Sequence, residues 1–125
     1  MKLKRYGFFS ELEHGDPDGV SLIGLRDTGR WDANEKPLAV EYLRSGVLLV
    51  GCPGVVTDVL AGSDGGEAEA IGSPHVLTDG EWAWPADLAY YVDRYNVPVP
   101  DEFLARMRAA NWRAPEVKDL QSLEL

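Results

Sequence analysis

Residues 78–112 read TDGEWAWPADLAYYVDRYNVPVPDEFLARMRAANW, and this stretch decides the fold that we expect. It holds three of the four tryptophans of the chain. Asp-Gly at 79–80 is typical of a two-residue type I′ turn, in which Thr78 would pair with Glu81. Strand alternation then places four side chains on one face, which we expect to be buried: His75, Leu77, Trp82 and Trp84. We interpret the indoles as scaffold and not as part of a reaction centre.

Two helices are expected to follow this hairpin. Pro85 suits the first turn of a helix whose apolar positions repeat with helical spacing, namely Leu88, Tyr91, Val92 and Tyr95. Asn96 ends that helix. Pro100 opens a second helix, whose inner face is formed by Phe103, Leu104, Met107 and Ala110. Trp112 is expected to cover the core just past its end.

The residues before the hairpin predict one helix and two strands. Asp32 or Asn34 caps a helix that runs to about Ser45. Residues 47–50 are typical of a buried strand. Residues 55–60 predict a second strand, paired antiparallel with the first.

The ends of the chain and one internal segment carry weaker patterns. Residues 3–9 favour a strand, whereas the apolar run at 20–25 fits either a strand or a helix. Residues 61–74 are rich in glycine and serine and predict a mobile loop. We therefore expect a single α+β domain over residues 1–112, with a small antiparallel sheet of three to five strands, about three helices packed against it, and a polar tail at 113–125.

The chain is acidic, with 21 Asp and Glu against 12 Lys and Arg and a formal net charge of −9. Such a surface repels nucleic-acid phosphates and anionic lipid, so we expect neither nucleic-acid nor membrane binding. It would instead attract a basic protein partner. Acidity that only keeps the protein in solution is the simpler alternative.

The cellular compartment is predicted from two features. Cys52 is the only cysteine, so no internal disulfide forms, which favours a reducing compartment. The basic N-terminus lacks the apolar run of a secretory signal, and the longest apolar stretch is too short to cross a bilayer. We expect a cytoplasmic protein.

The residues offer few groups for catalysis. His75 is expected to be a hydrogen-bonded residue at the edge of the core, and His14 a solvated turn residue. Asp58 lies among aliphatic residues and must face water, an arginine or a site. An acid–base pair of Asp58 with Asp79 or Glu81 stays open. We assign no catalytic residue, no cofactor and no metal site.

Tyr90 is predicted to lie on the outer face of its helix among charged residues. An exposed tyrosine ringed by charge is a recurrent composition of binding hot spots. An ordinary surface tyrosine is the alternative. The residues predicted to form an interface are Tyr90, Asp87, Asp93, Glu81 and Asp58.

Three segments resemble a group of small actinobacterial proteins of unassigned function. They are YGFFSEL at 6–12, YLRSG at 42–46, and the signature TDGxWxWPxDLxYYV followed by PxEFL within 78–112. The group is similar in size, acidity and cytoplasmic character to immunity proteins of bacterial toxin systems. This resemblance implies no activity and carries over no active-site residue.

Three functional hypotheses follow. The first is a non-enzymatic protein-binding module, in its more specific form an immunity-type inhibitor that occludes a basic toxin. The second is a small carboxylate-dependent hydrolase or isomerase, which requires Asp58, His75 and Glu81 to converge. The third is a homodimeric regulatory subunit.

Overall fold

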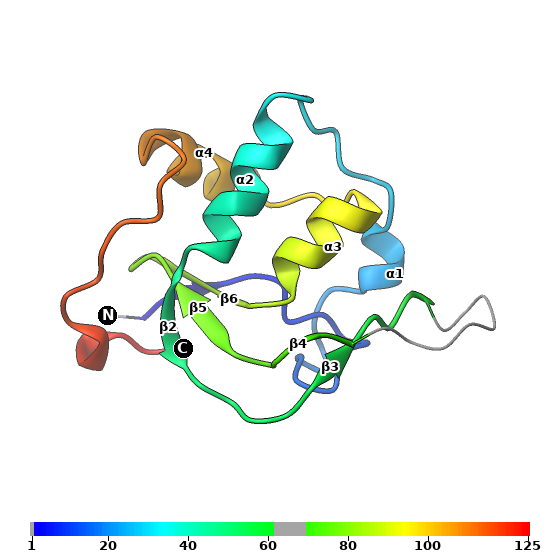
Figure 1. The fold of residues 1–125 in the computed structure, drawn as a ribbon, viewed down its shortest axis with the longest axis horizontal. Helices are drawn as coiled ribbons and strands as arrows, with labels where there is room; N and C mark the ends of the chain where they lie inside the picture. Colours follow the sequence, from blue (N-terminus) through cyan, green and yellow to red (C-terminus); the bar gives the residue numbers. More distant parts are fainter. Residues whose placement is uncertain (1, 62–69) are drawn as a thin grey trace.

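The computed structural model describes residues 2–61 and 70–125 (Figure 1). Their elements are, in chain order, β1 (Lys4–Arg5), α1 (Leu22–Leu25), α2 (Glu35–Arg44), β2 (Val47–Val50), β3 (Val56–Thr57), β4 (Ala70–Gly72), β5 (Val76–Thr78), β6 (Trp82–Pro85), α3 (Leu88–Tyr95), α4 (Asp101–Ala109) and the 3₁₀ turn η2 (Leu120–Ser122). The predicted α+β class, with a small sheet and about three substantial helices, is confirmed.

The main sheet has four strands in the order β1-β6-β5-β2. β5 pairs antiparallel with both β6 and β2, whereas β1 runs parallel to β6, so the sheet is mixed. β3 and β4 form a separate two-stranded sheet. β3 and β4 lie between β2 and β5 in the sequence. β2 pairs with β5 alone and forms one edge of the main sheet.

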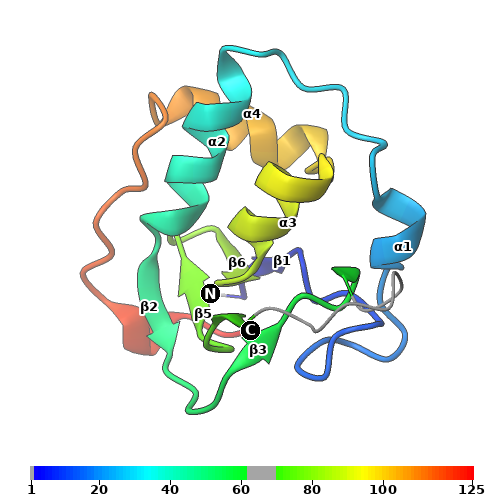
Figure 2. The same cartoon turned by 45° about the vertical axis from the view of Figure 1, so that its right-hand side comes forward.

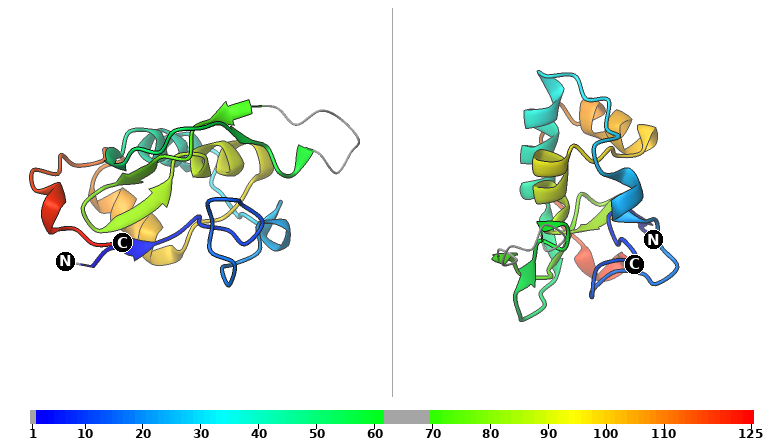
Figure 3. Two further views of the ribbon diagram at one scale, coloured as in Figure 1. Left: turned by 90° about the horizontal axis from the view of Figure 1, so that it is seen from below. Right: turned by 90° about the vertical axis from the view of Figure 1, so that its right-hand side faces the viewer.

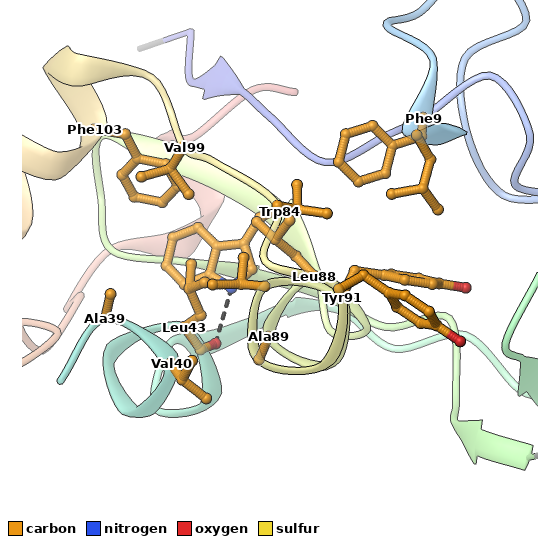
Figure 4. Packing of buried hydrophobic residues seen from close by; sticks show 14 of the residues in the cluster. Phe9, Ala39, Val40, Leu43, Trp84, Leu88, Ala89, Tyr91, Val99 and Phe103 are labelled. Carbon is orange, nitrogen blue, oxygen red and sulfur yellow. Dashed lines mark hydrogen bonds between the residues drawn. The ribbon is translucent and has the colours of Figure 1, made fainter. Parts of the chain in front are cut away.

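The helices gather on one side of the main sheet, where α2 and α3 lie side by side (Figures 2 and 3). The larger hydrophobic core fills the space between these helices and the main sheet. Trp84 is fully buried at its centre, and its indole Nε1 donates a hydrogen bond of 2.9 Å to the carbonyl oxygen of Leu43 in α2 (Figure 4). The expectation that the tryptophans of the hairpin serve as scaffold agrees with this packing.

The second face of the sheet is also covered. Leu3, Phe8, Val76 and Ala83 form a smaller buried cluster there, against which Leu49 and Leu123 pack. All four residues of β6 are buried. The hairpin therefore lies between two apolar layers, and not on one core as the alternation predicted.

The predicted two-residue turn is wrong. Thr78 pairs with Ala83, so four residues, 79 to 82, lie between the paired positions, and the last of them is already the first residue of β6. The Asp79 carboxylate accepts hydrogen bonds from the backbone N–H groups of Glu81 and Trp82, and the Thr78 hydroxyl donates to the Trp82 carbonyl. These side-chain bonds build a wider turn. Because the register moves by two residues, Leu77 still shares its face with Trp84, its actual partner.

The predicted strand at 55–60 is also wrong in length and pairing. β3 covers only Val56–Thr57 and pairs with β4, while β2 pairs with β5. Strand geometry ends where the Asp58 carboxylate accepts the backbone N–H groups of Leu60 and Ala61 and turns the chain. Of the loop expected at 61–74, residues 62–69 lie outside the described residues, and residues 70–72 form β4.

The helix boundaries follow from local chemistry. The Asp32 carboxylate accepts the N–H groups of Asn34 and Glu35 and so caps α2. Pro85 closes β6 instead of opening a helix, and α3 begins only at Leu88. Asn96 ends α3 in the left-handed conformation, as expected.

Both ends of the chain pack onto the main sheet. The strand expected at 3–9 is reduced to β1, and the run at 20–25 contains the short helix α1. The tail at 113–125 returns to β1, where Leu3 N–H donates to the Glu124 carbonyl. The termini consequently lie close together (Figure 1). Among the described residues, no helix combines the length and the apolar character needed to cross a bilayer.

Candidate functional site

The longest uncharged run of the chain lies on its surface. The thirteen residues from 45 to 57, SGVLLVGCPGVVT, hold no charge, although 26% of the chain is Asp, Glu, Lys or Arg. We call residues 45–57 the uncharged segment. It carries three exposed aliphatic side chains, Leu48 (50%), Val50 (37%) and Val55 (71%). Single exposed aliphatics are ordinary, but a run of them without any charge on an acidic protein indicates a contact surface.

The uncharged segment includes β2, an edge strand. The opposite edge, β1, is covered by the returning tail through the bridge between Lys2 and Glu124. β2 forms its ladder with β5, and no other described residue makes a backbone hydrogen bond with it. The pairing register with β5 shifts between Leu48 and Val50, which interrupts the regular edge. β2 nevertheless lacks the charges and prolines that usually block an edge strand.

A groove adjoins the far end of the uncharged segment. Two neighbouring cavities of about 300 Å³ and 80 Å³ share four lining residues, Glu13, His14, Val55 and Val56. Pro53 and Pro74 complete the wall of the larger cavity, and Leu12 and Val59 that of the smaller. We call this the Val55 groove. Most of its lining residues are apolar, and its two titratable side chains, Glu13 and His14, come from one loop.

His14 is held by a buried carboxylate. Its Nε2 lies 2.9 Å from Oδ2 of Asp87, whose side chain is 2% exposed. Asp87 occupies the N-cap position of α3, but its side chain makes no hydrogen bond with the helix backbone. The Asp87 carboxylate, by this contact and by its charge, raises the pKa of His14 against the opposing effect of burial. His14 lies in a turn, as expected, but it is not solvated: its side chain is 17% exposed, because a residue distant in sequence supplies its partner.

Asp58 forms a second buried polar group. One carboxylate oxygen accepts the hydroxyl hydrogens of Tyr90 at 2.6 Å and Tyr95 at 2.5 Å. The other accepts the two backbone N–H groups of the turn that follows. Burial opposes ionisation of the carboxyl group, but these hydrogen bonds outweigh it and hold the pKa of Asp58 below its usual range. Asp58 thus satisfies its charge within the fold.

Asp79 forms a third group around the β5–β6 turn. Its Oδ2 accepts the Tyr42 hydroxyl at 2.5 Å and lies 3.6 Å from Arg106 Nε. The same Nε lies 3.6 Å from the Glu81 carboxylate. Burial, followed by the contact with Asp79, raises the pKa of Tyr42. Asp79 and Glu81 therefore share an arginine, and neither has a hydrogen bond with Asp58.

His75, just before β5, is half-buried and hydrogen-bonded, as expected of a residue at the edge of the core. Its Nδ1 accepts the backbone N–H of Cys52 at 2.9 Å, and its carbonyl accepts the N–H of Ala86. Asp58, His75 and Glu81 consequently contact three different sets of partners. Within residues 2–61 and 70–125, no three His, Cys, Asp or Glu side chains gather closely enough to hold a metal ion.

The predicted interface residues are spread over several environments. Asp93 is exposed and Glu81 is partly exposed. Asp58 and Asp87 are buried in the networks described above. Tyr90 is half-buried and packs against the core, so the prediction of an exposed tyrosine is wrong. Its hydroxyl is engaged by Asp58, and burial together with this bond raises the pKa of Tyr90. A role of these five residues in binding stays a prediction.

Sequence reasoning missed the Val55 groove and the pair of His14 with Asp87. The run without charge at 45–57 was a signal that could have identified the exposed segment. The histidine–aspartate pair left no local pattern, because its members belong to different elements. Comparisons with models of known protein families, with curated proteins and with solved structures find no match to this chain.

Proposed function

We propose that the protein is a non-enzymatic protein-binding module that contacts its partner through the uncharged segment. The observation that carries this proposal is the exposure of Leu48, Val50 and Val55 within thirteen uncharged residues of a chain with a net charge of −9. Burial of such side chains against a partner contributes about 25 cal/mol per Å² of apolar surface removed from water. The central part of a protein interface is typically poor in charge in this way.

The acidic remainder of the surface favours a basic partner. Opposite net charges accelerate encounter and disfavour wrong partners, while the uncharged contact supplies most of the affinity. Among the residues predicted to form an interface, Asp93 and Glu81 reach solvent and are proposed as steering charges. The more specific form of the proposal is an immunity-type inhibitor that occludes a basic toxin in the cytoplasm. Its support is small size, acidity and the resemblance stated above.

The test is capture followed by reconstitution. A tagged chain is used at low salt to isolate a stoichiometric partner from the producing cell, and the purified pair is then titrated by calorimetry. Leu48→Ser and Val55→Ser should each weaken binding by about 1–2 kcal/mol. Ile23→Ser is the matched control, since Ile23 is 65% exposed but lies outside the uncharged segment. Equal affinity of all three variants would reject the proposed contact surface.

A homodimer is the second candidate, and the open edge of β2 favours it. Two copies of this edge could pair antiparallel around a two-fold axis without bringing charges together. Light scattering distinguishes the two candidates. A dimer that Val50→Lys converts to monomer supports the second, whereas a monomer at all accessible concentrations leaves the first. The hydrolase or isomerase hypothesis receives no support from the contacts of Asp58, His75 and Glu81.

A further inference from the structure

The Val55 groove combines mainly aliphatic lining residues with a carboxylate, that of Glu13, which forms no ion pair in the described part of the chain. Glu13 lines both cavities and is exposed. No Lys, Arg or His side chain among the described residues forms an ion pair with it, although His14 is its neighbour in the chain. A carboxylate beside an apolar wall matches a ligand that has an aliphatic stem and a positive head.

Asp87, which lies behind His14, carries a negative charge, as Glu13 does. Asp87 is buried next to His14: its Oδ2 lies 2.9 Å from His14 Nε2, and neither carboxylate oxygen has a hydrogen bond of regular geometry in the described part of the chain. Glu13 lines this end of the groove, and Asp87 lies behind His14 without lining it, so the local charge is negative when His14 is neutral. The other residues that line it carry no charge. An anionic ligand would therefore be repelled, and a neutral apolar ligand would leave Glu13 without a partner.

We propose that the Val55 groove receives an arginine or lysine side chain of the protein partner, with its aliphatic stem on Val55 and Val56 and its charged head at Glu13. This subsite rests on the proposed protein-binding function and adds the chemistry of one contact. Long cationic side chains commonly bury their methylene groups on apolar surface while the head stays hydrated. The uncharged segment then supplies the apolar contact and one wall of the cation subsite.

The charge of His14 modulates this subsite. Three groups set its electrostatics: His14 itself, Glu13 beside it in the chain, and Asp87 from α3. The residues of β3 and its approach that pack on the other side are uncharged. Protonation of His14 adds a positive charge next to the carboxylate that holds the ligand head. Acidification should consequently weaken cation binding in the groove.

The test uses n-pentylguanidinium as the probe, with binding followed by amide chemical shifts. We expect saturable shifts at residues 13, 14, 55 and 56, with a dissociation constant on the order of 1–10 mM for so small a ligand. Hexanoate carries the same alkyl chain with the opposite charge and should bind at least tenfold more weakly. Equal binding of the two probes, or no saturation by the cation well above that range, would overturn the proposal.

Variants of the folded protein sharpen the test. Glu13→Gln should weaken binding of n-pentylguanidinium about threefold, the size expected for one exposed ion pair. Glu41→Gln, the same change at an exposed position on α2, should leave it unchanged. Binding to the parent chain should be weaker near pH 5.5 than near pH 8.5, two values on either side of the titration of His14, whereas His14→Gln should remove this pH dependence. Equal effects of the two glutamine variants would contradict the placement of the cation at Glu13.

Failure of this inference and failure of the proposed function give different results. A captured partner whose affinity depends on Leu48 but not on Glu13 keeps the function and rejects the cation subsite. Saturable binding of the guanidinium probe, without any partner that contacts the uncharged segment, keeps the cation subsite and rejects the proposed function.

Discussion

His14 Nε2 lies 2.9 Å from the carboxylate of Asp87, which joins the loop after β1 to the start of α3. The Asp87 side chain is almost fully buried, and this histidine is the partner of its charge among the described residues. Removal of one member of a buried pair leaves the other without compensation, which costs much more than the pair itself contributes. Since His14 lines both cavities of the Val55 groove, its contact with Asp87 holds that wall of the groove in place.

This pair predicts a specific dependence of stability on pH. Because the pKa of His14 is raised in the folded protein, its stabilisation is complete below the unfolded value of about 6.5 and is lost as pH rises through the folded value. The difference in unfolding free energy between the parent chain and His14→Gln should be larger near pH 5.5 than near pH 8.5. Urea denaturation at several pH values measures it. A difference that stays constant with pH would contradict the account.

Asp58→Asn should destabilise the protein by about 2–3 kcal/mol. The substitution removes the charge that accepts two tyrosine hydroxyls and two backbone N–H groups in a buried position. Asp93→Asn, on an exposed position of α3, is the matched control and should change stability by no more than about 0.5 kcal/mol. The urea midpoints of the two variants provide the comparison, and equal midpoints would show that the Asp58 network contributes nothing.

Gly46→Ala should be destabilising, by about 1–3 kcal/mol. A Cβ atom at Gly46 would lie 2.5 Å from Cζ2 of the buried Trp84 indole. The chain therefore needs glycine there because the indole packs against its backbone, and α2 has already ended at Arg44. Gly51→Ala is the control, since its nearest neighbour would be 3.8 Å away. Thermal unfolding of both variants checks the prediction, which fails if their midpoints fall by the same amount.

Trp84→Phe should cost more than Trp31→Phe, with a difference of about 1–2 kcal/mol. Both substitutions remove an indole N–H that donates to a backbone carbonyl, of Leu43 and of Val97 respectively. Trp84 is fully buried, so its replacement also leaves a cavity and an unsatisfied buried carbonyl, whereas Trp31 is partly exposed. Urea denaturation measures both changes. A larger loss of unfolding free energy for Trp31→Phe would contradict the assignment of Trp84 to the centre of the core.

Much of the fold could be predicted from local patterns. The spacing of apolar residues identified α2, α3 and α4, and the stretch that holds Trp84 was correctly assigned to a hairpin. The turn itself was not predictable from Asp-Gly alone, because the Thr78 hydroxyl and the Asp79 carboxylate hold a wider loop than a type I′ turn. Leu77 and Trp84 were still correctly placed on one face of the sheet, because the actual register differs from the predicted one by an even number of residues.

The polar networks were the part that sequence patterns did not reveal. Asp58 was expected to face water, an arginine or a site, but it is buried, and its partners are two backbone N–H groups of its own turn and two tyrosines of α3, far along the chain. Tyr90 was expected on the outer face because helical periodicity does not show what a neighbouring loop places above a helix. The pairing of His14 with Asp87 likewise depends on how the loop after β1 folds over α3, and no local spacing encodes that arrangement.

Hydrogen exchange of the reconstituted complex tests the central claim most directly. Peptides that cover residues 45–57 should exchange more slowly when the partner is bound, because the contact buries the open edge of β2 and the approach to β3. Peptides from α1, which carries the exposed Ile23, should be unchanged. Protection confined to other parts of the chain, with residues 45–57 exchanging as fast as in the free protein, would contradict the account.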